Sequence, residues 1–252
     1  MSQSTNYTAA IVIVGNEILS GRVQDINVAW IASRLNDRGI RLKEVRVVSD
    51  IEADIIKAVN ELKVQYTYIF TTGGIGPTHD DITAESIAKA CHTTLHIDPV
   101  ARKLLEDYYG AENVNEARLK MARVPVGSSL ISNPVSVAPG FKIENIHVMA
   151  GIPRIMQSMF DNILPTLAGG TPMISNTVNC GLTESMIAKG LTDIQNKYQT
   201  VEIGSYPHMR AGKEALSLVL RSTHEDDLKA STQELIDLVK SLGGTPTLMA
   251  SF

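Results

Sequence analysis

Three loops carry the residues of this sequence that are best suited to chemistry. The stretch TTGGIGPTHDDIT, residues 71–83, combines three glycines with two adjacent carboxylates, Asp80 and Asp81. Glycines let backbone N–H groups approach an anion, and a following helix adds positive potential at its N-terminus. Adjacent carboxylates suit Mg²⁺, which commonly takes one or two of them together with phosphate oxygens. The stretch therefore predicts a site for a phosphate-bearing ligand and a divalent cation.

A structural interpretation of the same stretch stays open. Thr78, followed three residues later by Asp81, also fits a helix N-cap with an acidic residue in the first turn. Capping would leave Asp80 without a role. The loop is not a P-loop, because Pro77-Thr78-His79 stands where that motif has its Lys-Ser/Thr pair, and His79 replaces the third glycine of a dinucleotide-binding loop.

Two further loops add carboxylates and hydrogen-bonding groups. Glu17 lies in GNEILSG, after the first apolar run, and Asp50 closes VVSD, after the second. Either carboxylate could instead cap a helix, and an Asn at the start of a helix is a common N-cap. The first loop and the helix start after it carry three such polar side chains, Asn16, Ser20 and Asn27.

The elements that must position these loops alternate along the chain. β-Branched or alternating runs predict strands, and apolar residues at helical spacing predict helices. Such alternation implies right-handed crossovers and a doubly wound, mostly parallel sheet whose ligands bind beyond the carboxyl ends of its strands. The three loops should therefore meet in one crevice. The predicted elements are strand 8–15, helix 27–39, strand 41–50, helix 51–64 and strand 66–74.

The rest of the chain is predicted to complete this domain and to add a smaller one. Gly-Gly-Thr-Pro at 169–172 cannot continue a helix and predicts a hinge between a domain at 1–169 and an α+β domain at 172–252. The second domain reads as strand, helix, strand, strand, helix. Before the hinge we expect helices at 82–91, 99–110 and 115–125, a hairpin of GFKI and IHVM, and a last helix from RIMQSMF.

Composition excludes several classes of function. The 252 residues are 44% hydrophobic with a net charge of −4, so there is no basic field for nucleic acid or anionic membrane. No apolar run approaches the roughly 20 residues of a membrane span. The N-terminus lacks a signal-peptide pattern. Cytoplasm is the expected location. Cys91 and Cys180 lack zinc or disulfide spacing.

Together these blocks resemble the molybdenum-cofactor-biosynthesis fold family, which includes MogA and MoaB, and within it the amino-terminal part of the CinA competence-damage-inducible type. VGNEILSGRVQDIN, VVSD, TTGGIGPTHDDITAESIA, NPVSVAPGF and GIPRIMQSMF occur in family order. IGSYP resembles the small KH-like domain of CinA, but without a GxxG loop, so RNA binding is not expected. The nicotinamide-nucleotide deamidase domain of CinA has no counterpart. Ser136, Ala150 and Ile155 depart from the usual Gly, Pro and Glu.

The resemblance implies a domain that binds a pterin or a nucleotide pyrophosphate. In MogA-like members the acids at the positions of Asp50 and Asp81 act in catalysis. CinA-like members are associated with metal-dependent hydrolysis of ADP-ribose-type pyrophosphates. Our first hypothesis is a pyrophosphatase acting on ADP-ribose or FAD, with Asp50, Asp80 and Asp81 holding a divalent cation of the Mg, Mn or Co class. The water-activating base is not assigned.

Two other hypotheses stay beside the first. The protein could bind molybdopterin or a nucleotide without turnover, or transfer adenylate as MogA-like enzymes do. It could also have lost the site and work only through subunit contacts. A dimer or trimer is expected from the relatives. The residues expected to contact the ligand are Gly15, Asn16, Glu17, Ser20, Asn27, Thr72, Gly73, Gly74, Gly76, Pro77, Thr78, Thr83, Pro139 and Gly140.

Overall fold

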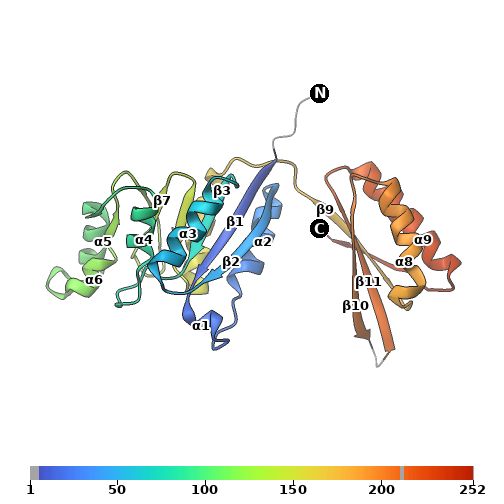
Figure 1. The fold of residues 1–252 in the computed structure, drawn as a ribbon, viewed down its shortest axis with the longest axis horizontal. Coiled ribbons are helices and arrows are strands. Elements are labelled where there is room, and N and C mark those ends of the chain that lie inside the picture. Colours follow the sequence, from blue (N-terminus) through green and yellow to red (C-terminus); the bar gives the residue numbers. More distant parts are fainter. Residues whose placement is uncertain (1–5, 211–212, 252) are drawn as a thin grey trace. The chain divides into compact units, whose positions relative to one another are not determined.

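The chain divides into two compact units, each with its own core. A computed structural model describes residues 6–210 and 213–251. The first unit is Met1–Gly170 and the second is Thr171–Phe252 (Figure 1). None of the helices in residues 6–210 and 213–251 has an apolar stretch of the length that a membrane span requires.

The first unit is built on a six-stranded sheet. Its strands are β1 (Tyr7–Val14), β2 (Ile40–Val48), β3 (Tyr68–Thr72), β6 (Ser129–Ile131), β7 (Gly140–Ile143) and β8 (Ile146–Met149). Their order is β2-β1-β3-β8-β7-β6, parallel from β2 to β8 and antiparallel at β7 and β6. The expected α/β fold with a mostly parallel sheet is confirmed.

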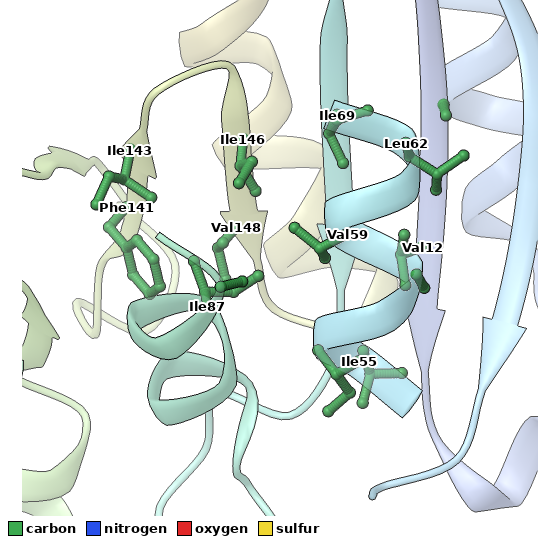
Figure 2. Close-up of a cluster of buried hydrophobic side chains, with 14 of the residues drawn as sticks. Val12, Ile55, Val59, Leu62, Ile69, Ile87, Phe141, Ile143, Ile146 and Val148 are labelled. Atoms are coloured by element: carbon green, nitrogen blue, oxygen red, sulfur yellow. The ribbon is translucent and has the colours of Figure 1, made fainter. Parts of the chain in front are cut away.

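Helices bury both faces of this sheet. They are α2 (Asn27–Asp37) and α7 (Pro153–Ile163) on one face, and α3 (Glu52–Lys63) and α4 (Thr83–Ala90) on the other. Figure 2 shows the core between the sheet and the helices α3 and α4. There, Ile55, Val59 and Leu62 project from α3 at helical spacing onto Val12 of β1 and Val148 of β8. β1 is apolar at almost every position because successive side chains enter opposite cores.

The segment after α4 differs from the prediction in one place. It contains β4 (Leu95–Ile97), α5 (Pro99–Tyr109), a 3₁₀ turn (Ala111–Asn113), α6 (Glu116–Lys120) and β5 (Arg123–Pro125). The helix expected over 115–125 is therefore too long, because its last residues form β5 and pair antiparallel with β4. Val124 precedes a proline, which disfavours helical backbone, and its side chain is buried in the core.

The second unit is a four-stranded antiparallel sheet with two helices. Its elements are β9 (Ile174–Cys180), α8 (Glu184–Lys197), β10 (Glu202–Arg210), β11 (Lys213–Ser222), α9 (Glu225–Ser241) and β12 (Thr247–Ser251). The strand order is β10-β11-β9-β12. This is the split β-α-β arrangement of ferredoxin-like folds, so the KH-like expectation is wrong. The sequence reading missed β12, which pairs with β9 and closes the pattern.

The Gly-Gly pair expected to form the hinge is held against the first unit. Arg38 donates to the Leu167 carbonyl from Nε (3.1 Å) and Nη2 (3.0 Å). Gly170 donates its N–H to the Gly39 carbonyl at 3.3 Å. A Cβ on Gly169 would lie 2.0 Å from the Arg38 carbonyl oxygen, so only glycine permits this approach. The chain therefore leaves the first unit after Gly170.

One buried side chain makes the stability of the first unit depend on pH. His147 of β8 is 2% exposed and packs against the ring of Phe70, with centroids 5.2 Å apart. Burial, with a smaller contribution from Lys142, lowers the pKa of His147 to about 4, from 6.5 in a free side chain. The folded state therefore favours neutral His147. Its contribution is complete above pH 6.5 and is lost as the pH falls toward 4.

We expect acidification from pH 8 to pH 4 to lower the unfolding free energy of the wild-type protein by about 3 kcal/mol more than that of the His147→Phe variant, because Phe cannot bind a proton. Urea unfolding of both proteins across this range measures the difference. Carboxylates titrate in both proteins and cancel in the comparison. Parallel curves would contradict a buried neutral histidine.

Candidate functional site

A pocket of about 490 Å³ lies where the strands of the parallel sheet end. Glu17 follows β1, Asp50 follows β2, and Gly151 follows β8, and all three line this pocket. Residues 73–78, 80 and 81, which follow β3, line it as well. The three loops expected to converge do line one cavity. Its volume is in the range of sites for small molecules and cofactors.

The glycine turn after β3 has a backbone that only glycine tolerates. Gly73 and Gly74 have φ of +101° and +68°, and a Cβ on either would lie 2.2 Å from another atom, the Val14 carbonyl oxygen or Thr83 Oγ1. Thr83, the first residue of α4, donates from Oγ1 to the Gly73 carbonyl and from its N–H to the Gly74 carbonyl, both at 2.9 Å. Thr83 thus holds the turn against α4 and does not line the pocket.

Three consecutive backbone donors are available in this turn. The N–H groups of Gly74, Ile75 and Gly76 donate to no group among the described residues, and all three residues line the pocket. Unpaired backbone N–H groups in a turn form a concavity suited to an anion. The turn can therefore accept phosphate oxygens without any basic side chain.

The acidic pair does not cap a helix. α4 begins at Thr83 with Ile82 as its N-cap and no side-chain cap, so the capping interpretation of Thr78 and Asp81 is wrong. Instead, Asp81 Oδ2 accepts the Thr78 N–H at 2.8 Å and closes a turn within the loop. This turn directs both carboxylates of the pair toward the pocket that they line.

The hydroxyl of Thr78 lies between the two carboxylates. Its Oγ1 is 2.6 Å from Asp80 Oδ1 and 2.5 Å from Asp81 Oδ2. A hydroxyl has one proton, so it can donate to only one of them and faces the other with a lone pair. The Thr78 hydroxyl, followed by the backbone N–H of Asp80, holds the pKa of Asp80 below its ordinary value. The loop thus concentrates negative charge that a cation would neutralise.

Asp50 does not cap α3, the helix that follows it in sequence. α3 begins at Glu52 with Ile51 as its N-cap and no side-chain cap. Asp50 Oδ2 accepts the N–H of Asn16 at 2.8 Å, which fixes the loop after β1 to the loop after β2. Asn16 therefore acts through its backbone behind the pocket surface.

Two further segments line the pocket, residues 133–138 and 150–155, and none of their lining residues was among the predicted ligand contacts. Asn133 is 5% exposed, donates from Nδ2 to Ser136 Oγ at 2.7 Å and to the Ala138 carbonyl at 2.8 Å, and shapes residues 133–138. Asn27 donates from Nδ2 to the Gly151 carbonyl at 2.9 Å, while Asp25 accepts the Val28 N–H. Asn27 is therefore not the N-cap of α2 but a brace for the loop after β8.

The expected ligand residues thus divide into two groups. Those that line the pocket are Glu17, Asp50, Gly73, Gly74, Gly76, Pro77, Thr78, Asp80 and Asp81. The pocket lining does not include Gly15, Asn16, Ser20, Asn27, Thr72, Thr83, Pro139 or Gly140, although Pro139 borders a small neighbouring cavity with Asp81. The lining residues that were not selected include Val23, Asn133, Ser136, Ala138, Gly151 and Ile152. The blocks NPVSVAPGF and GIP were the available signal for most of them.

The electrostatics of the pocket are one-sided. Four carboxylates line it, Glu17, Asp50, Asp80 and Asp81, and its described lining contains no Lys, Arg or His. Lys120 is not part of the pocket lining, and its Nζ donates to the Thr78 carbonyl at 2.5 Å. In the described part of the chain, no three His, Cys, Asp or Glu side chains converge closely enough to form a metal site from protein ligands alone. The carboxylates share the pocket without meeting at one point.

The fold and the pocket define an α/β protein with a cavity of small-molecule size where its parallel strands end. Residues 10–169 match the family described as "Probable molybdopterin binding domain", and residues 172–243 match "FAD synthase, middle domain". The chain belongs to the first of these families, the MogA/MoaB-like molybdopterin-binding domain proteins.

Three relatives illustrate the similarity. A protein from Pyrobaculum calidifontis is 31% identical, covering 93% of this chain and 96% of that protein. A probable FAD synthase from Caenorhabditis briggsae is 28% identical across 95% of this chain, which spans 51% of that relative. The crystal structure of CinA from Thermoplasma acidophilum is 32% identical with a TM-score of 0.61, covering 65% of this chain and 99% of that structure.

Proposed function

We propose that the first unit hydrolyses the pyrophosphate of a dinucleotide-like compound, FAD or ADP-ribose, with a divalent cation. The observation that carries the proposal is the composition of the pocket. Its lining combines three residues with unpaired backbone N–H groups and four carboxylates, and its described part contains no basic side chain. A pyrophosphate is strongly negative, so carboxylates would repel it unless a cation lay between them.

The residues present fit a hard divalent cation. All candidate ligands are oxygens, and the Thr78 hydroxyl leaves one of its two carboxylate contacts without a proton. Mg²⁺ typically uses one or two carboxylates together with substrate phosphate and water, and does not require a closed protein cage. Asp80 and Asp81 would hold the cation, and phosphate oxygens of the substrate and water would complete its ligands. Asp50, expected as a third ligand, lines the same pocket but forms no three-carboxylate cluster with them in the described residues. A cation there would neutralise charge that develops on the phosphate oxygens.

The chain's own groups would orient the substrate. The N–H groups of Gly74, Ile75 and Gly76 would bind oxygens of one phosphate, and the carboxylates of the same pocket would hold the cation. Water adds to one phosphorus as the bridging P–O bond breaks, which gives two phosphomonoesters. Val23 and Ile152 are 48% and 62% exposed and line the same pocket, so they offer an apolar surface to a planar ring.

The names of the relatives favour a flavin substrate. The second unit matches a domain of FAD synthase, and a relative covering nearly the whole chain is named a probable FAD synthase. Hydrolysis of FAD would yield AMP and FMN. We therefore rank FAD before ADP-ribose.

A panel of metals and substrates tests the proposal. The full chain, stripped with a chelator, is mixed with FAD or ADP-ribose and with Mg²⁺, Mn²⁺ or Co²⁺, and release of AMP is followed by chromatography. We expect AMP with at least one metal and none when chelator is present. Turnover that persists in chelator would contradict the cation requirement.

The alternative proposal is binding of molybdopterin or a nucleotide without hydrolysis, or adenylyl transfer. It is favoured by the family, which is described as molybdopterin-binding. Tight binding of a pterin or nucleotide, with no AMP release under any metal, would select it. Appearance of an adenylylated pterin would select the transfer reaction.

A further inference from the structure

We propose that Glu17 is the base that activates water in the hydrolysis described under the proposed function, on which this assignment rests. Hydrolysis of a pyrophosphate is assisted by a group that takes a proton from the attacking water as the water oxygen bonds to phosphorus. Glu17 lies in α1 (Asn16–Leu19), the short helix that follows β1 (Figure 1), and it lines the pocket.

The composition of the pocket excludes other kinds of base. Its described lining contains no His, Lys, Arg, Tyr or Cys, so the proton acceptor has to be a carboxylate. His79 precedes the acidic pair in sequence, but its side chain is 98% exposed and it is not among the lining residues. The candidates are the four lining carboxylates, Glu17, Asp50, Asp80 and Asp81.

Three of these carboxylates already accept hydrogen bonds from the protein or lie beside a donor. Asp50 Oδ2 accepts the Asn16 N–H, and Asp81 Oδ2 accepts the Thr78 N–H, both at 2.8 Å. Asp80 Oδ1 lies 2.6 Å from the Thr78 hydroxyl. A hydrogen bond to a carboxylate stabilises its charged form and so makes it a weaker base. A cation bound by Asp80 and Asp81 would weaken these two further, for the same reason.

The carboxylate of Glu17 is free to take a proton. Within residues 6–210 and 213–251 its side chain is exposed and has no hydrogen-bond or ion-pair partner. Its backbone, in contrast, is fixed, because the Glu17 carbonyl accepts the Val23 N–H at 3.1 Å and the Ser20 hydroxyl at 3.2 Å. Glu17 can therefore hold a water molecule without giving up another bond.

Gly15 leaves the space in which this carboxylate lies. A Cβ on Gly15 would lie 2.5 Å from Glu17 Oε1 and 2.6 Å from Oε2. The φ of Gly15 is 166°, extended backbone that other residues also adopt, so the glycine is needed for space and not for conformation. Ile13 pairs with Thr72, so the chain leaves β1 beside the glycine turn that follows β3. The carboxylate thus lies at the sheet edge where the phosphate would bind.

The reaction step balances for FAD and water alone. The water oxygen bonds to one phosphorus, Glu17 takes the proton that this water loses, and the bridging P–O bond breaks with its electron pair passing to the other phosphate. AMP and FMN are the products. Protonated Glu17 is exposed and returns its proton to solvent.

Glu17→Gln tests a role as base against a role in cation binding. The variant keeps the size of the side chain but cannot take the proton, so we expect kcat for AMP release from FAD to fall about 100-fold or more. KM for FAD and the cation concentration that gives half-maximal activity should change little. Glu116→Gln, at an exposed glutamate of α6 outside the pocket, is the control and should match wild type. A much higher cation requirement in Glu17→Gln would overturn the assignment.

Rescue by small acids is a readout that a merely structural role would not move. Glu17→Ala opens space at the pocket, so added formate or acetate should restore part of kcat by taking the proton instead. Glu17→Gln opens no such space and should not respond. Asp50→Ala is the comparison with another lining carboxylate. Failure to rescue Glu17→Ala, or rescue of Asp50→Ala in its place, would overturn the assignment.

A double-mutant cycle tests the position of the carboxylate. Gly15→Ala should lower kcat about tenfold or more, because the new Cβ displaces the carboxylate, but it should have little effect in the Glu17→Gln background. Thermal unfolding shows whether each variant is folded. Equal losses in both backgrounds would show that Gly15 does not act through Glu17 and would contradict the geometry behind the assignment.

The assignment and the proposed function fail in different ways. A wild-type protein that releases no AMP with any metal would overturn the proposed function, and the base with it. Normal AMP release by folded Glu17→Gln would leave the function standing and would overturn the base alone.

Discussion

Asp81→Asn is expected to lower AMP release from FAD or ADP-ribose by at least about 100-fold while the protein stays folded. The substitution keeps an oxygen that can accept the Thr78 N–H, now 2.8 Å from Asp81 Oδ2, but it removes the negative charge that a divalent cation requires. Melting in chelator should change little or rise, because two neighbouring carboxylates repel each other in the absence of a cation. Single-turnover assays and thermal unfolding measure the two effects.

Asp98→Asn is the matched control for this substitution. Asp98 also accepts backbone N–H groups, from Val100 at 2.8 Å and Ala101 at 2.9 Å, but it does so at the N-terminus of α5, outside the pocket. Asn caps helices about as well as Asp, so both activity and stability should be retained. Asp50→Asn should behave like Asp81→Asn. Normal turnover in Asp50→Asn and Asp81→Asn would remove the catalytic assignment.

Gly74→Ala and Gly76→Ala change the same loop, but the first should mainly lower stability and the second should mainly lower turnover. Gly74 has φ of +68° and its new Cβ would lie 2.2 Å from Thr83 Oγ1, so we expect a loss of about 2 kcal/mol or more in unfolding free energy. Gly76 has no positive φ, and its Cβ would lie 2.7 Å from Asp81 Oδ2. Its cost should fall on the position of that carboxylate, and hence on turnover, with stability changed by about 1 kcal/mol or less.

Gly21→Ala separates backbone strain from steric conflict. Gly21 has φ of +70°, close to that of Gly74, but a Cβ there would meet nothing within 4 Å. It should therefore show the loss caused by φ alone, about 1 kcal/mol. Urea unfolding of the three variants gives the comparison. Equal losses in Gly74→Ala and Gly76→Ala would mean that the whole turn is structural and that Gly76 has no particular relation to Asp81.

Most helices and strands of the first unit could be predicted from the sequence, because their apolar residues recur with a simple period. β1 is apolar at almost every position, and α3 repeats its buried residues at helical spacing. The prediction failed where the same pattern of apolar residues is compatible with both a helix and a strand. Residues 115–125 carry apolar side chains that suit a helix, but tertiary pairing with β4 takes the last three as β5. β12 was missed because its period-two signal is short and follows two glycines.

The sequence predicted which loops form the site, but it did not predict which of their side chains line the pocket. Sequence order placed Glu17, Asp50 and Asp81 in one crevice, since topology alone brings strand ends together. Which neighbours face the ligand depends on side-chain direction and hydrogen bonding that no local pattern encodes. Asn27 and Thr83 have the chemistry of ligand contacts, yet each satisfies a backbone carbonyl instead. Ile152 lines the pocket through its position after β8.

The order of strands in the sheet also determines when the pocket can come into existence during synthesis. β2 and β3 each pair with β1 and are made soon after it, but β3 must wait for β8, since Ile69 pairs with Ile146. Contacts so distant in sequence form slowly, because a long intervening segment must be ordered first. A nascent chain that has already made its glycine turn therefore still lacks the wall at Gly151 and Ile152. Ligand or cation can assist folding only after that late strand has docked.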